Sequence, residues 1–143
     1  MSEEGYRRQQ TSKRIYVWFF LLVLIISGNF IIAPNPLPKP DYVPTIVNGL
    51  VTSMSILMAF AFFSVTHFHT TIKDDTERWR YHLLAMLYLL VLFFVLIFGI
   101  MIGYRLVLTG ELGYAFGCFM TLFIIMCGII MDMWIVSADF YLK

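Results

Sequence analysis

Four long stretches without a charged residue constrain the fold of this chain more than any other feature. They cover residues 15–33, 43–66, 83–104 and 112–131. A helix of about 20 apolar residues crosses the roughly 30 Å hydrocarbon layer of a bilayer, so each stretch can cross once. Continuing the last helix to residue 138 adds one charged residue, Asp132. We therefore predict an all-α integral membrane protein, a four-transmembrane-helix bundle with short loops that forms one domain over residues 1–143.

Composition agrees with a membrane protein and excludes several other classes. Hydrophobic residues make up 60% of the chain and charged residues only 13%, whereas a soluble domain carries about 25% charged residues. The net charge of +1 leaves too few cations to neutralise phosphates, so we expect no nucleic-acid partner. The first apolar stretch is longer than the core of a signal peptide, and we expect it to be a retained anchor.

The distribution of basic residues predicts the orientation in the membrane. Of the ten Lys and Arg residues, eight fall before the first span, between the second and third spans, or at the end of the chain: Arg7, Arg8, Lys13, Arg14, Lys73, Arg78, Arg80 and Lys143. Only Lys39 and Arg105 fall on the other side. Basic residues are enriched in short cytoplasmic segments. We therefore expect a multi-pass protein with both termini in the cytoplasm.

The three connections between the spans differ in character. All five prolines lie within residues 34–44, a pattern that predicts an extended outer loop, either a spacer or a docking strip for a partner with an aromatic groove. In the inner loop, residues 70–81, Asp74 could cap the third helix, with Glu77 completing a capping box. The short outer connection, residues 105–111, predicts a tight antiparallel hairpin of the third and fourth helices.

Two glycine pairs with a spacing of four flank that hairpin turn. They are Gly99 with Gly103, and Gly113 with Gly117. Glycines four apart form a shallow groove on a helix, where a second helix can approach closely. We predict that these pairs serve helix packing within the chain, with homodimerisation as the alternative.

Small polar residues gather on one face of two of the predicted helices. At 100° per residue, Asn48, Thr52 and Ser55 share a face of the second helix, and Thr121 and Asp132 share a face of the fourth. We expect these polar faces to contact protein rather than lipid. In one possible arrangement the two faces contact each other. They could serve packing alone or line a path for a proton, an ion or a small solute. The first helix should be the most lipid-exposed.

Asp132 is the residue with the strongest functional signal, because an acid in the middle of a span costs about 2.5–3.5 kcal/mol on insertion scales. We expect it to bond to Thr66 or His69 or to pair with an Arg, and we consider proton or ion handling as an alternative. His69, His82 and Asp132 form a weak candidate metal site. The sequence offers no catalytic residue set, and no cofactor is expected.

Function follows from weighing classes of membrane protein. Short loops and polar faces suited to packing favour a small accessory or structural subunit within a larger membrane complex, whose partners are the bilayer and other membrane subunits. One alternative is an oligomeric transport protein that uses Asp132 and the polar faces. Another is a ligand-bearing subunit of a membrane metal or redox enzyme. We expect no catalytic activity of the chain's own.

Overall fold

The computed structural model describes residues 3–32 and 43–142, and nearly all of them are helical. The helices are α1 (Glu3–Ile32), α2 (Val43–Thr71), α3 (Asp75–Leu108) and α4 (Leu112–Leu142). All four are long and apolar enough to cross a membrane, which indicates a multi-pass membrane protein. The predicted all-α fold is compatible with this four-helix arrangement. The Pro-rich connection predicted at residues 34–44 lies almost entirely outside the described residues.

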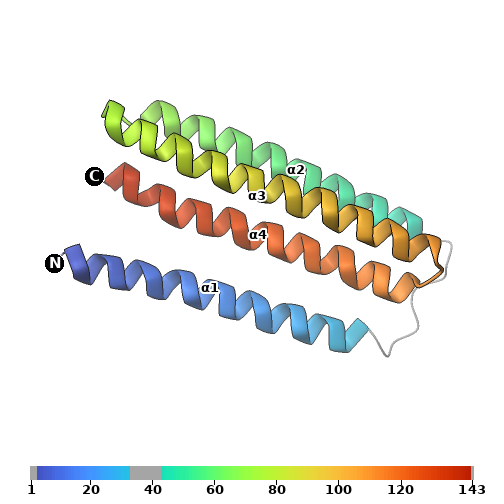
Figure 1. Ribbon diagram of the computed structural model, residues 1–143. Coiled ribbons are helices and arrows are strands. Elements are labelled where there is room, and N and C mark those ends of the chain that lie inside the picture. Colours follow the sequence, from blue (N-terminus) through green and yellow to red (C-terminus); the bar gives the residue numbers. More distant parts are fainter. Residues whose placement is uncertain (1–2, 33–42, 143) are drawn as a thin grey trace.

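Helix α4 forms the centre of the bundle. It packs against each of the other three helices, α2 and α3 also touch each other, and α1 lies mainly on α4. Figure 1 shows α1 on one side of α4, with α2 and α3 on the other. In the candidate span of α1 only 6% of the residues are buried, against 44% in α4. The first helix is thus the most exposed, as the sequence predicts.

Both chain ends lie at one end of the bundle, together with the turn between α2 and α3 (Figure 1). We call this the terminal end, and the end with the α3–α4 turn the hairpin end. All four helices run further than the apolar stretches toward the terminal end: α1 begins at Glu3, and α3 at Asp75. Polar residues can continue a helix after it leaves the hydrocarbon, so the bundle extends past the membrane-spanning part at this end.

Between α2 and α3 only residues 72–74 are non-helical, and α3 begins within the connection predicted at residues 70–81. The Asp74 side chain caps α3 by accepting a hydrogen bond from the Thr76 backbone N–H at 2.9 Å, as predicted. Glu77 pairs with Arg80 at 3.3 Å. The Arg78 guanidinium donates to the Ile72 carbonyl at 2.7 and 3.0 Å and closes the turn.

The predicted hairpin of α3 and α4 is present, and its turn depends on one glycine. Gly110 has a φ of +81° and donates its N–H to the Val107 carbonyl at 3.1 Å. The Glu111 N–H donates to the Leu106 carbonyl at 3.0 Å. These two bonds form a Schellman motif, whose left-handed residue is usually glycine because a Cβ is unfavourable there.

The core lies between α2, α3 and α4. Helix α2 contributes Val47, Met54 and Ala61, which are spaced by seven residues and therefore lie on one face. Helices α3 and α4 fill the rest with large apolar side chains, among them Leu89, Leu92, Phe119, Leu122, Met126, Ile130 and Met133.

Glycines allow close contact at two places on α4. A Cβ added at Gly103 of α3 would lie 2.5–3.0 Å from the Phe119 ring, and one at Gly99 would meet the Leu122 side chain. On α4 itself, a Cβ at Gly128 would lie 2.5 Å from Leu21 of α1. At these sites a large side chain of one helix occupies the space left by a glycine on the other.

Candidate functional site

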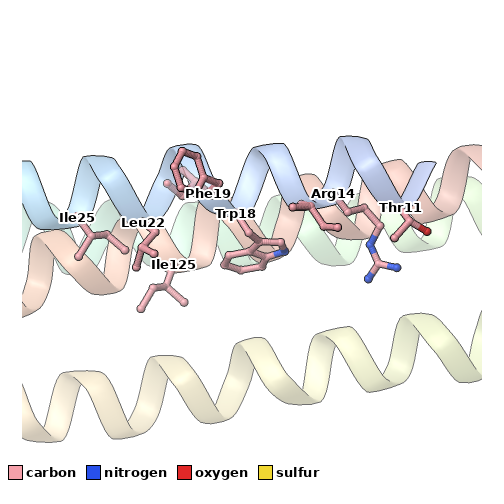
Figure 2. A pocket seen from close by; sticks show the side chains of 9 residues that line it. Thr11, Arg14, Trp18, Phe19, Leu22, Ile25 and Ile125 are labelled. Atoms are coloured by element: carbon pink, nitrogen blue, oxygen red, sulfur yellow. The ribbon is translucent and has the colours of Figure 1, made fainter. Parts of the chain in front are cut away.

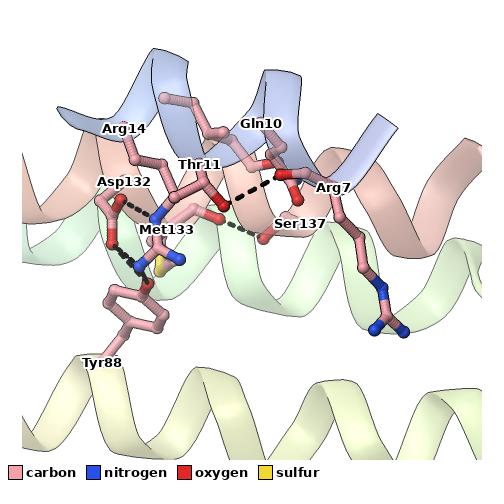
Figure 3. Close-up of polar contacts among 9 residues, drawn as sticks. Arg7, Gln10, Thr11, Arg14, Tyr88, Asp132, Met133 and Ser137 are labelled. Atoms are coloured by element: carbon pink, nitrogen blue, oxygen red, sulfur yellow. Dashed lines mark hydrogen bonds and ion pairs between the residues drawn. The ribbon is translucent and has the colours of Figure 1, made fainter. Parts of the chain in front are cut away.

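A polar cluster joins three helices near the terminal end of the bundle. The Asp132 carboxylate of α4 accepts hydrogen bonds from Arg14 of α1 and Tyr88 of α3 (Figure 3). Arg14 Nε lies 2.6 Å from Oδ1, and Arg14 Nη2 lies 2.9 Å from Oδ2. The Tyr88 hydroxyl donates to Oδ2 at 2.6 Å and also lies 3.4 Å from Arg14 Nη2. A single carboxylate thus connects α1, α3 and α4.

The Arg14–Asp132 ion pair joins two side chains that differ in exposure. Arg14 contacts both carboxylate oxygens, the two-point arrangement that gives arginine–carboxylate pairs their directional strength. The Asp132 side chain is only 6% exposed, whereas that of Arg14 is 42% exposed. The acid is therefore enclosed by protein, while the guanidinium has one side open to the surroundings.

The depth of the cluster follows from helix lengths. Asp132 lies about twenty residues after the start of α4, and Tyr88 about twenty residues before the end of α3. At 1.5 Å per residue both are about 30 Å from the hairpin end, which is the thickness of the hydrocarbon layer. Arg14 is the last charged residue before the first apolar stretch. A hydrocarbon layer that begins at the hairpin end would therefore end close to the cluster, and we expect lipid headgroups near it.

Other contacts hold α1 against α4 around this pair. Gln10 donates its side-chain amide to the Ile135 carbonyl at 3.1 Å, about one helical turn closer to the terminal end. Toward the membrane interior, Leu21 and Trp18 lie over Gly128. The polar cluster is thus the centre of a continuous α1–α4 contact.

The structure selects one of the roles that the sequence suggested for Asp132. Among the described residues its hydrogen bonds are with Arg14 and Tyr88, and not with Thr66 or His69. Sequence reasoning missed the identity of the arginine and the part played by Tyr88. The available signals were Arg14 at the edge of an apolar stretch and the phenol group of Tyr88 inside another stretch.

The polar faces of α2 and α4 do not meet. Asn48, Thr52 and Ser55 are exposed, while Thr121 is half-buried and Asp132 is buried. The expectation that the two faces contact each other is therefore wrong for this chain. The reason is that α2 turns its apolar residues, spaced by seven, toward the core, which leaves its polar face outside.

The three candidate metal ligands are not brought together. The rings of His69 and His82 lie 5.6 Å apart between centroids, and Trp79 stacks on His82 at 6.0 Å. Asp132 is instead engaged by Arg14 and Tyr88. Within residues 3–32 and 43–142, no group of three potential metal ligands has a geometry that could hold an ion. The predicted site of His69, His82 and Asp132 is therefore not formed.

Of the four glycines predicted to serve packing, Gly99 and Gly103 of α3 lie against α4. Gly99 and Gly103 face large α4 side chains, and Gly117 is buried while Gly113 is half-buried. The facing partners of Gly99 and Gly103 are leucine and phenylalanine.

Comparison with known proteins gives no match: no family model fits the chain, and neither a curated protein nor a solved structure is significantly similar to it.

Proposed function

We propose that this chain is a small accessory subunit that packs within a larger membrane protein complex through the exposed polar face of α2. We define this face by Asn48, Gly49, Thr52 and Ser55. The observation that carries the proposal is their exposure on a helix that is long and apolar enough to cross a membrane. Small and polar residues are typical of the interfaces between transmembrane helices, and an apolar surface would suit lipid better.

The contacts of this face show how a second helix could approach. Thr52 and Ser55 donate their hydroxyls to carbonyls one turn earlier, at 2.8 and 3.0 Å. A Cβ added at Gly49 would meet nothing within 4 Å. Within residues 3–32 and 43–142 the Asn48 side-chain amide forms no hydrogen bond. The face is therefore flat, open at Gly49, and still able to form hydrogen bonds through Asn48.

A transport role has less support. The Asp132 carboxylate already accepts from Arg14 and Tyr88, and the polar residues of α2 and α4 do not face a common path. The cluster around Asp132 instead holds α1 on the bundle. We infer that its role is to keep a small subunit in one shape while a partner binds elsewhere.

We further propose that the terminal end is cytoplasmic. Eight of the ten Lys and Arg residues precede the first span, lie between the second and third spans, or end the chain. Basic residues are enriched in short cytoplasmic segments, so this distribution favours a cytoplasmic terminal end. In this orientation the polar cluster lies at the inner edge of the hydrocarbon.

The proposal is tested by purifying the tagged chain from its native membrane in mild detergent and identifying co-purifying proteins by mass spectrometry. A stoichiometric larger partner is expected. Gly49→Leu should release it, because the new side chain fills the open position on α2. Gly28→Leu is the matched control, since a Cβ there also meets nothing within 4 Å but lies on α1. A homogeneous homo-oligomer without partners would overturn the accessory role, and a partner retained by Gly49→Leu would overturn the assigned face.

A further inference from the structure

An apolar groove of about 690 Å³ follows α1 away from the polar cluster. Its lining comes mainly from α1, and Ile125 of α4 also contributes. Figure 2 shows Trp18, Leu22 and Ile25 pointing from α1 into the space on the side of α3. The groove exists because α1 packs mainly on α4 and leaves its α3-facing side uncovered.

The terminal end of this groove is polar and lies beside the ion pair of Arg14 and Asp132. Thr11 and Arg14 line it there, whereas nearly all the remaining lining residues are apolar. Arg14 uses Nε and Nη2 to contact Asp132 and Tyr88. Within the described residues its Nη1 takes part in no hydrogen bond or ion pair, and the side chain is 42% exposed. One edge of the guanidinium is thus held in place while the other remains available to a ligand.

We propose that the groove binds one acidic phospholipid, with its phosphate at Arg14 and an acyl chain along Trp18, Leu22 and Ile25. The Thr11 hydroxyl already donates to the Arg7 carbonyl at 2.9 Å, so Thr11 borders the headgroup position without donating to it. The planar fork of arginine suits phosphate. Basic pockets between transmembrane helices at the cytoplasmic side are known to take acidic headgroups. Arg7, Arg8 and Lys13 on the same helix add positive charge at that end.

The length of the groove favours a lipid over a partner helix. From Arg14 to Ile25 the helix rises about 16 Å at 1.5 Å per residue. Half of a roughly 30 Å hydrocarbon layer is about 15 Å, so the apolar part matches one leaflet. A transmembrane helix needs a contact surface that continues across both leaflets. An amphiphile with a charged head and a chain one leaflet long fits both the length and the polarity of this groove.

The site can be tested on the purified full chain in nanodiscs or detergent, with native mass spectrometry as the readout of bound lipid. The probes are phosphatidylglycerol and phosphatidylcholine with identical acyl chains. We expect one phosphatidylglycerol molecule to bind at least fivefold more tightly than phosphatidylcholine. Equal affinity for the two lipids would overturn the proposal.

Two pairs of variants locate the lipid. Thr11→Glu adds a negative charge in the groove and should weaken phosphatidylglycerol binding about fivefold, the weight of one unit charge near a membrane surface. Gln9→Glu, the same change of charge outside the groove lining, should leave binding unchanged. Ile25→Trp should weaken binding of both lipids by filling the groove, and Ile26→Trp, just outside it, should weaken neither. Equal effects within either pair would contradict the assigned site.

A photoreactive side chain at position 22 tests the occupant in native membranes. Lipid adducts are expected, and a dominant adduct to another protein would overturn the lipid assignment in favour of a protein interface. The lipid preference is measured on the chain alone in nanodiscs. It therefore stays valid even if the proposed partner subunit or the proposed membrane orientation is wrong. Orientation decides only which leaflet supplies the lipid.

Discussion

At the scale of single residues, Asp132 can lie within a membrane-spanning helix because donors from two other helices surround its carboxylate. Arg14 supplies a compensating charge at 2.6 and 2.9 Å, and Tyr88 supplies a neutral hydrogen bond at 2.6 Å. Removing one member of a buried pair leaves an uncompensated charge, which is more costly than replacing both members. This asymmetry makes the pair testable.

A double-mutant cycle on Arg14 and Asp132 should show strong coupling. We expect Arg14→Gln to lower the free energy of unfolding by about 3 kcal/mol, because it leaves a buried carboxylate without its partner. Asp132→Asn should lower it by less, because the guanidinium left behind is 42% exposed, and the double variant should lower it by clearly less than the sum. The measurement is denaturant unfolding in lipid bicelles. Arg8→Gln, an exposed arginine on the same helix, is the matched control and should be neutral. Additive single effects would contradict a direct pair.

Tyr88 has a separate, smaller effect. Tyr88→Phe keeps the ring and removes only the hydroxyl that donates to Asp132. A hydrogen bond to a charged group contributes about 1.5–3 kcal/mol, and we expect a loss in this range. The same substitution in the Asp132→Asn background should cost less, because the acceptor is no longer charged. An equal cost in both backgrounds would show that Tyr88 acts independently of the acid.

At the scale of helices, glycines decide which elements approach closely. Gly128 lets α1 lie against α4, where Leu21 and Trp18 occupy the space above it. Gly99 and Gly103 have the equivalent role between α3 and α4. Gly49, by contrast, has no neighbour within 4 Å of an added Cβ. Glycines of similar sequence context thus differ sharply in what surrounds them.

This difference predicts the outcome of two matched substitutions in the isolated chain. Gly128→Leu should lower the free energy of unfolding by about 1–3 kcal/mol, the usual cost of overfilling a packed contact. Gly49→Leu should be neutral or slightly stabilising, since leucine favours helix more than glycine does. Unfolding in bicelles again provides the comparison. Equal behaviour of the two variants would argue against the close α1–α4 contact.

Apolar stretches predicted all four helices, the short connection at residues 105–111 predicted the hairpin, and the spacing of Asp74 and Glu77 predicted the cap, because each of these depends on local sequence. Contact between the polar faces of α2 and α4 is not found, because Val47, Met54 and Ala61 form the buried face of α2 and leave its polar residues exposed. The partner of Asp132 could not be derived from local pattern, since Arg14 precedes it by 118 positions. Only the packing of α1 on α4 brings the two together.

At the scale of the whole molecule, three helices form a packed unit and α1 is attached along one side of it. Helix α4 belongs to the three-helix unit and also carries α1, which explains why it is the most buried helix. The unequal arrangement leaves two kinds of free surface: the polar face of α2 and the groove beside α1. These are the surfaces that we assign to a partner subunit and to a lipid.

Orientation of the whole molecule can be checked by labelling single cysteines in intact cells with a membrane-impermeant maleimide. Cys118 and Cys127 are first replaced by alanine, since both are half-buried in α4. Thr109→Cys, in the exposed hairpin turn, should react from outside the cell. Lys73→Cys, in the exposed turn at the terminal end, should react only after the membrane is permeabilised. Both positions lie in short turns between long helices, so their reactivity reports on sidedness. The reverse pattern would place the terminal end outside and would move the charged end of the lipid groove to the outer leaflet.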